Sequence, residues 1–198
     1  MKSDRNIDFL YEIGSLRNIP RAWQQILTGK VQNISEHLFR VTMIAWMIAV
    51  AEKADTEKVI KIALIHDVSE SRTGDIAFMH RDYVVRHEEL AETDIFKDTL
   101  LEKEAKNLLK EYMDRMSLEA KIVKDADNLD VDLELKELSK IGDSGAMGMQ
   151  KQHRPTIRAK KLYTKTAKKM WDDIQKINPN SWHESLTGKW VQSKKSAK

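Results

Sequence analysis

The chain has 198 residues, enough for one domain with a sizeable core, and its 33% charged residues predict a well-solvated surface. It has no cysteine, which excludes disulfides, thiolate zinc sites and a cysteine nucleophile and fits a cytoplasmic protein. No uninterrupted apolar run reaches 18 residues, so we expect no membrane-spanning segment.

The net charge of +3 is unevenly distributed along the chain. Residues 151–198 carry thirteen Lys and Arg against three Asp and Glu, a local charge of +10, which leaves −7 for the remainder. A basic stretch can bind nucleic acid or attract phosphorylated small molecules. A solvated helix face followed by a tail explains the same pattern more simply, so nucleic-acid binding is the less favoured interpretation.

The N-terminal segment predicts a helix over 6–16, followed by a turn. Pro20 disfavours helical backbone at the residue before it, so the chain should turn or start a new helix there. Arg21 could then clamp a phosphate, and Trp23 could stack against a base or sugar. The two residues could instead be a surface arginine and a core tryptophan. Composition alone favours this simpler explanation.

A long apolar helix should follow, capped by Asn33 or Ser35 and ending at about Lys53. His37 lies four residues before Val41, on the stripe of this helix that we expect to be buried. A single histidine in such a position is usually a core residue with satisfied hydrogen bonds. It becomes a candidate ligand only if other ligands converge on it.

The next helix, expected over 55–71, ends in a His-Asp pair. His66 follows Ile62 by four residues and should face inward, and Asp67 points about 100° away around the helix. A buried aspartate without a partner is costly, so the pair suggests a cation. An arginine partner or exposure to water would also explain Asp67.

Beyond this pair we expect a loop over 71–76 that places Asp75 near the candidate site. Residues 77–81 should remain irregular and could form a rim or lid. From 82 to about 113 the sequence shows helical periodicity. We interpret its many charged residues as a solvated face without a catalytic role.

The helix expected over 117–138 carries an acidic residue on an apolar stripe. Asp127 lies four residues from both Val123 and Val131 and therefore shares their face. A bound metal would explain an acid in that position. Three other acids of the helix should face solvent: Asp125, Asp130 and Asp132.

The C-terminal part should contain a glycine-rich loop over 141–148 and a last long helix over 156–177. We expect one domain over 1–180 and an arm or tail over 181–198. There is no P-loop, no dinucleotide-binding fingerprint and no alternating strand pattern. The sequence therefore predicts an all-α, single-domain helical bundle.

Two imidazoles and two carboxylates on separate helical segments would together provide a mixed nitrogen and oxygen ligand set. The four residues are His37, His66, Asp67 and Asp127. Such a set suits one divalent ion of Mn, Fe, Co, Ni or Zn, with a weaker preference for Mg. The ion can polarise a phosphoryl oxygen and lower the pKa of bound water.

Four motifs together resemble those of the HD-domain superfamily of metal-dependent phosphohydrolases. They are S-E-H at 35–37, H-D-x-S-E-x-x-T-G-D at 66–75, K-x-A-D at 124–127 and P-R-A-W at 20–23. The combination is most similar to one branch, the 5′-deoxynucleotidases, and the resemblance spans about residues 10–140. It implies an HD-domain helical bundle that assembles as a homodimer.

The resemblance also implies a role for each candidate residue. The metal would be held by His37, His66, Asp67 and Asp127. Glu70 would be the general acid/base for the leaving 5′-oxygen, and Asp75 would orient the attacking water or the sugar. Arg21 would contact the phosphate, and Trp23 would pack beside the sugar and help to reject a 2′-hydroxyl.

We therefore expect hydrolysis of deoxyribonucleoside 5′-monophosphates to the deoxyribonucleoside and phosphate. One alternative is an HD-type phosphohydrolase that cleaves a nucleoside di- or triphosphate or a phosphodiester. Another is a non-catalytic module that binds nucleic acid through the basic C-terminal third. The intact four-ligand set argues against the second alternative.

Overall fold

The computed structural model describes residues 4–184, and these form ten α-helices and three short 3₁₀ helices. Within these residues the only strand-like pairing is an isolated bridge between Pro20 and Asn33. The predicted all-α fold class is confirmed. Of the arm expected over 181–198, only residues 181–184 are described.

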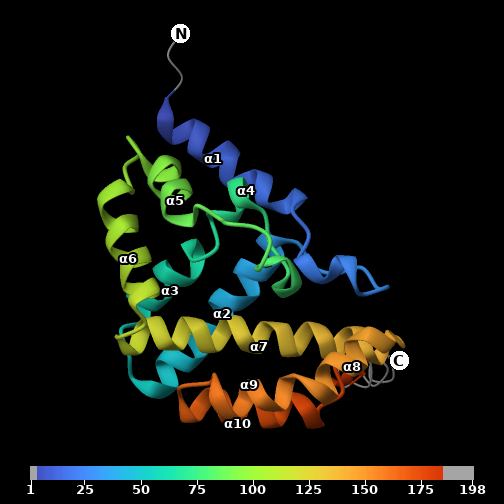
Figure 1. Ribbon diagram of the computed structural model, residues 1–198. Coiled ribbons are helices and arrows are strands. Elements are labelled where there is room, and N and C mark those ends of the chain that lie inside the picture. Colours follow the sequence, from blue (N-terminus) through green and yellow to red (C-terminus); the bar gives the residue numbers. More distant parts are fainter. Residues whose placement is uncertain (1–3, 185–198) are drawn as a thin grey trace, which may run out of the picture.

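Two long helices, α2 (Ile34–Glu52) and α7 (Leu118–Lys140), lie against each other at the centre of the molecule (Figure 1). The other elements surround this pair. They are α1 (Arg5–Ser15), η1 (Leu16–Asn18), η2 (Ala22–Gln25), α3 (Thr56–Ile65), α4 (Glu70–Thr73), η3 (Phe78–His80), α5 (Glu88–Phe96), α6 (Glu102–Asp114), α8 (Ser144–Gln152), α9 (Arg154–Lys160) and α10 (Lys165–Lys176).

Helix α2 begins at a complete capping box, in which the side chain of Asn33 accepts from the backbone of Glu36 and the side chain of Glu36 accepts from the backbone of Asn33. Its buried face packs with α3 and α7. The largest fully buried side chains of this core include Val41, Ile48, Val59, Ile62, Ile122 and Leu129. The core thus fixes α2, α3 and α7 relative to one another, and these three helices carry the candidate ligands or end beside them.

By length and composition α2 could cross a membrane, although the sequence contains no unbroken apolar run of 18 residues. Half of the apolar stretch of this helix is buried within the domain. An apolar helix in the middle of a helical bundle meets the same criteria, because it has neighbours on several sides. In this fold α2 is the central helix.

The helix expected over 55–71 is interrupted directly before the His-Asp pair. Helix α3 ends at Ile65, residues 66–69 form a turn, and the short helix α4 begins at Glu70. The backbone N–H of Glu70 donates to the carbonyl oxygen of Asp67 at 3.1 Å, which closes this turn. A turn, rather than a continuous helix, therefore positions Glu70 after the His-Asp pair.

The periodic stretch over 82–113 consists of two helices, α5 and α6, joined by a turn over 97–101. Asp98 adopts a left-handed backbone conformation with φ of 60°, which a continuous helix does not permit. The helical periodicity of this stretch therefore belongs to two helices rather than one. Similarly, the helix expected over 156–177 is divided into α9 and α10.

Most of the glycine-rich stretch expected to be a loop is helix α8. Asp143 caps this helix by accepting the backbone N–H of Ala146, and its other oxygen accepts the N–H groups of Thr28 and Gly29, each at 2.8 Å. A Cβ at Gly145 would lie 3.0 Å from a side-chain carbon of Leu27, so glycine here allows α8 to pack closely. Close packing thus explains Gly145, whereas Gly142, with φ of 94°, lies in the turn before the helix.

The three acids of α7 that we expected to face solvent are fully buried, so that expectation was wrong. Asp132 forms a two-pronged ion pair with Arg154 of α9, at 2.8 and 2.7 Å. Asp125 accepts the backbone N–H groups of Tyr163 and Thr164, which sets the start of α10. Because α7 is enclosed by other helices, each buried carboxylate has found a charged or hydrogen-bonding partner.

Candidate metal centre

The structure brings the four candidate ligands together from three separate parts of the fold. His37 lies in the first turn of α2, His66 and Asp67 directly follow α3, and Asp127 lies on α7. One ligand atom from each residue lies within 4.8 Å of the others. His37 Nε2 is 3.4 Å from Asp67 Oδ2 and 3.5 Å from Asp127 Oδ1, and His66 Nε2 is 3.4 Å from Asp67 Oδ2.

The hydrogen bonds of the two imidazoles leave both Nε2 atoms available as ligands. Nδ1 of His66 donates to the carbonyl oxygen of Ala63 at 2.9 Å, and Nδ1 of His37 donates to Asp130 Oδ2 at 2.7 Å. These acceptors carry no hydrogen, so Nδ1 must hold the proton of the neutral ring. Nε2 of that ring then has a free lone pair. Both Nε2 atoms are buried without a hydrogen-bond partner and face carboxylate oxygens. A cation between them would satisfy all four groups, so this donor set fits a divalent metal.

The charges in the cluster favour a positive charge at its centre. Burial and the charge of Arg21 disfavour protonation of His37, but the carboxylates of Asp130, Asp67 and Asp127 outweigh them and raise its pKa to about 9. These carboxylates thus favour a positive charge at Nε2, which either a proton or a metal ion can supply. Burial lowers the pKa of His66. Burial would raise the pKa of both aspartates, yet the histidines hold that of Asp67 well below its usual range, and Lys124 lowers that of Asp127.

Two residues that we had not assigned to the site orient its ligands. Asp130, which we expected to face solvent, is fully buried and fixes the ring of His37. The ammonium group of Lys124 donates to Asp127 Oδ2 at 2.6 Å, which leaves Oδ1 facing His37. The sequence could have indicated a role for Asp130, because it lies about one helical turn beyond Asp127 and so on a similar side of the helix.

Glu70 is a buried carboxyl group beside the cluster. One of its oxygens, Oε2, has no hydrogen-bond partner, and Oε1 lies 3.6 Å from Arg86 Nη1. Burial, followed by the negative charges of Asp67 and Asp75, raises the pKa of Glu70 to about 10. The group therefore holds a proton at neutral pH, which a general acid requires.

Arg21 and Asp75 meet next to the cluster. Arg21 is only 6% exposed, and its guanidinium lies 3.5 Å from Asp67 Oδ2 and 3.2 Å from Asp75 Oδ2. The same oxygen of Asp75 accepts the backbone N–H of Ala22 at 3.0 Å. Arg21 is therefore not the surface arginine that composition favoured.

Trp23 lies beside Arg21, with its ring centroid 4.7 Å from the guanidinium carbon. Its indole N–H donates to Glu134 Oε2 on α7 at 2.9 Å. Glu134 is buried and was not predicted to take part. This arrangement fixes the orientation of the indole ring at the edge of the site, while its contact with a sugar stays a prediction.

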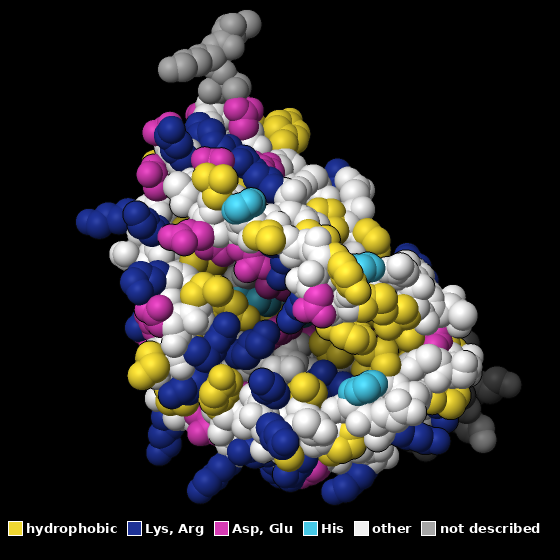
Figure 2. Space-filling model, in the orientation of Figure 1, with side chains coloured by type: hydrophobic (Ala, Val, Ile, Leu, Met, Phe, Trp, Pro, Cys, Tyr) yellow, Lys and Arg dark blue, Asp and Glu magenta, His cyan; other side chains and the backbone are white. Residues whose placement is uncertain are grey.

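Figure 2 shows how charged and hydrophobic side chains are distributed on one face of the molecule. Acidic and histidine side chains are recessed near the middle of this face, with Lys and Arg gathered on one side and hydrophobic side chains on the other (Figure 2). A phosphate ester with an apolar ring would meet complementary groups on both sides.

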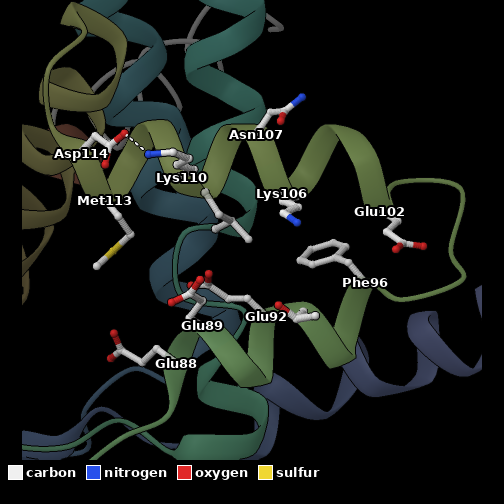
Figure 3. Close-up of a pocket in the computed structure, with 12 residues that line it drawn as sticks. Glu88, Glu89, Glu92, Phe96, Glu102, Lys106, Asn107, Lys110, Met113 and Asp114 are labelled. Atoms are coloured by element: carbon white, nitrogen blue, oxygen red, sulfur yellow. Dashed lines mark hydrogen bonds and ion pairs between the residues drawn. The ribbon is translucent and has the colours of Figure 1, made fainter.

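A separate cavity of about 430 Å³ lies between α5 and α6. Glu88, Glu89 and Glu92 line it from α5, and Lys106 and Lys110 line it from α6 (Figure 3). None of its lining residues belongs to the metal cluster, so it is distinct from the candidate site. The expected solvated face is thus partly enclosed, and burial followed by the charges of Glu88 and Glu89 raises the pKa of Glu92 to about 7.

Comparisons with known proteins agree with this geometry. The model of the HD domain family matches residues 13–178. The 5′-deoxynucleotidase HDDC2 of Danio rerio is 32% identical over 144 residues, which cover 70% of this chain and 72% of that protein. Its human counterpart is 30% identical over 137 residues, covering 66% and 67%.

Solved structures show the same fold. A conserved hypothetical protein from Pyrococcus furiosus superposes with a TM-score of 0.71 at 26% identity, covering 86% of this chain and 99% of that one. An HD phosphohydrolase of cyanophage S-2L, bound to dA and one catalytic Zn²⁺ ion, has a TM-score of 0.55 at 21% identity and covers 84% and 96%.

Proposed function

Because the chain belongs to the HD domain family, we propose that it is a metal-dependent phosphohydrolase that converts deoxyribonucleoside 5′-monophosphates to deoxyribonucleosides and phosphate. One observation carries the proposal: two buried imidazole nitrogens and two carboxylates share a space of metal-site size beside the buried carboxyl group of Glu70. Relatives named 5′-deoxynucleotidase support the choice of substrate.

The metal would be held by Nε2 of His37 and His66 and by the carboxylates of Asp67 and Asp127. When bound, a divalent ion would polarise the phosphoryl group and lower the pKa of a bound water. The ligand set suits Mn, Fe, Co, Ni or Zn, with Mg less preferred. In this proposal Asp130 orients His37, and Lys124 orients Asp127.

The remaining residues act on the substrate itself. The carboxyl proton of Glu70 would pass to the leaving 5′-oxygen. Arg21, held by Asp67 and Asp75, would contact the phosphate. Asp75 would also orient the attacking water or the sugar, and the ring of Trp23 would lie beside the sugar, where a 2′-hydroxyl would crowd it.

The test is a panel of substrates offered to the metal-loaded full chain. We expect phosphate release to be fastest from deoxyribonucleoside 5′-monophosphates, with slower release from the ribonucleotides. Pyrophosphate or triphosphate release from nucleoside triphosphates, or cleavage of a phosphodiester, would favour the alternative HD chemistry. No release from any monophosphate would contradict the proposal.

We also propose that the protein is a cytoplasmic homodimer, with α2 at the dimer interface. Five large apolar side chains of α2 are exposed along one face, spaced by four, three, one and three residues: Phe39, Met43, Trp46, Met47 and Val50. A helix that is apolar on nearly all sides is typical of one enclosed on all sides. Each partner of a stable dimer buries roughly 800 Å², and this exposed apolar face would form the centre of such an interface.

Placing a charge on this face should separate the dimer. Met47 is 62% exposed, so Met47→Glu should leave the fold intact and shift the mass in solution from dimer to monomer. Light scattering coupled to gel filtration measures this shift. Leu100→Glu, at a 90% exposed position away from α2, should remain a dimer. A wild-type protein that is monomeric at high micromolar concentration would overturn the dimer proposal.

A further inference from the structure

Arg86 reaches the candidate site from a segment to which we had assigned no chemistry. This segment leaves the site after Asp75, passes through η3 and returns directly before α5. Arg86 Nη2 forms an ion pair with Glu88 on the outer side, and Nη1 lies 3.6 Å from Glu70 Oε1 on the inner side. The guanidinium therefore lies between the cavity of Figure 3, which Glu88 lines, and the buried carboxyl group of Glu70.

The inner edge of this guanidinium has room for another acceptor. A separation of 3.6 Å is too long for a hydrogen bond, so Glu70 does not satisfy Nη1. Arginine carries five donors in a planar fork, and the fork matches the oxygens of a phosphate. The side chain of Arg86 is 22% exposed, so a ligand in the site can reach it.

The other cations near the metal cluster are already paired with acids. Arg21 lies between Asp67 and Asp75, and Lys124 donates to Asp127. A phosphate monoester carries nearly two negative charges at neutral pH and would approach the three aspartates of this site. A cation with spare donors on the Glu70 side would offset that repulsion, and Arg86 has this position.

We propose that Arg86 binds the phosphate group of the substrate, with Nη1 donating to a phosphoryl oxygen next to Glu70 while Glu88 holds the guanidinium from outside. This inference rests on the proposed phosphohydrolase function. It adds a second arginine to Arg21, so that two guanidinium groups would contact the phosphate. The scissile oxygen would then be directed toward Glu70.

Inorganic phosphate, the expected product, provides a direct test. Titration calorimetry with the metal-loaded full chain should show that Arg86→Ala weakens phosphate binding by roughly 10- to 100-fold, the usual loss for a charge-assisted hydrogen bond. Arg86→Lys keeps the charge without the fork and should lie between wild type and Arg86→Ala. Arg81→Ala removes an exposed arginine from the same segment and should bind phosphate like wild type.

Turnover separates this role from an indirect one. Arg86→Ala should raise KM for a deoxyribonucleoside monophosphate at unchanged metal content and melting temperature. If phosphate affinity is unchanged while kcat alone falls, Arg86 acts only through Glu70 and the proposal is wrong. Failure of the wild type to bind phosphate also overturns it. Arginine-dependent phosphate binding without monophosphate hydrolysis would support Arg86 and contradict the proposed function instead.

Discussion

Asp67→Ala should abolish phosphate release and remove the bound metal at the same time. Oδ2 of Asp67 lies 3.4 Å from Nε2 of each histidine, so this carboxylate is shared by the whole cluster. Its loss removes a ligand and leaves two buried imidazole nitrogens with less negative charge around a cation. A metal provides several kcal/mol of transition-state stabilisation, so turnover should fall on the order of 10³-fold or more.

Metal analysis of the purified protein and a phosphate-release assay measure the two effects together. Asp82→Ala, which removes an exposed aspartate outside the cluster, should retain both metal and activity. Circular dichroism checks that the helices are intact. A folded Asp67→Ala protein that still binds one equivalent of metal with wild-type affinity would show that the cluster is assigned incorrectly.

Glu70→Gln should reduce kcat by about 10²- to 10⁴-fold while the protein keeps its metal. Burial and the neighbouring acids raise the pKa of Glu70 to about 10, so the wild-type side chain is neutral at pH 7. Glutamine is also neutral and of similar size, and the change should therefore cost little stability. What it removes is the proton for the leaving oxygen.

A matched control is Glu92→Gln, which changes another partly buried glutamate with a raised pKa outside the cluster. It should leave kcat and metal content close to wild type. Near-normal turnover in Glu70→Gln would exclude Glu70 as the general acid. Loss of metal from the same variant would instead make Glu70 a ligand.

The four candidate ligands could be found from the sequence because each signal was local. His37 and Asp127 are polar residues at apolar spacing, and His66 and Asp67 form a recognisable doublet. The break between α3 and α4 did not hide them, because the doublet lies next to the break. Their joint position required only that the helices pack with their apolar faces together.

The buried partners of α7 could not be found in this way. Hydrophobic periodicity describes a helix with one buried face, whereas α7 is enclosed by several helices. Asp132 is satisfied by Arg154, and Asp130 by His37, far apart in the sequence. No pattern within the helix itself distinguishes such an acid from one in water.

The helix breaks have the same kind of cause. The division between α9 and α10 depends on the carboxylate of Asp125, which holds the backbone N–H groups of Tyr163 and Thr164 across 38 and 39 residues. Arg86 likewise could not be identified as a site residue from the sequence, because it lies near Glu70 only after its segment folds back. Contacts between residues so far apart in the sequence do not appear as a periodic pattern of hydrophobic residues.

The row of buried acids on α7 also restricts how the length of the chain can change in related proteins. Deleting one residue between Asp127 and Asp132 would rotate everything beyond it by about 100°. Either the metal side or the Arg154 side would then lose its partners, so insertions and deletions should be absent from this helix. The turn over 97–101 and the segment before Arg86 contain no row of buried acids whose helical spacing must be preserved. Differences in length between homologues should therefore accumulate there.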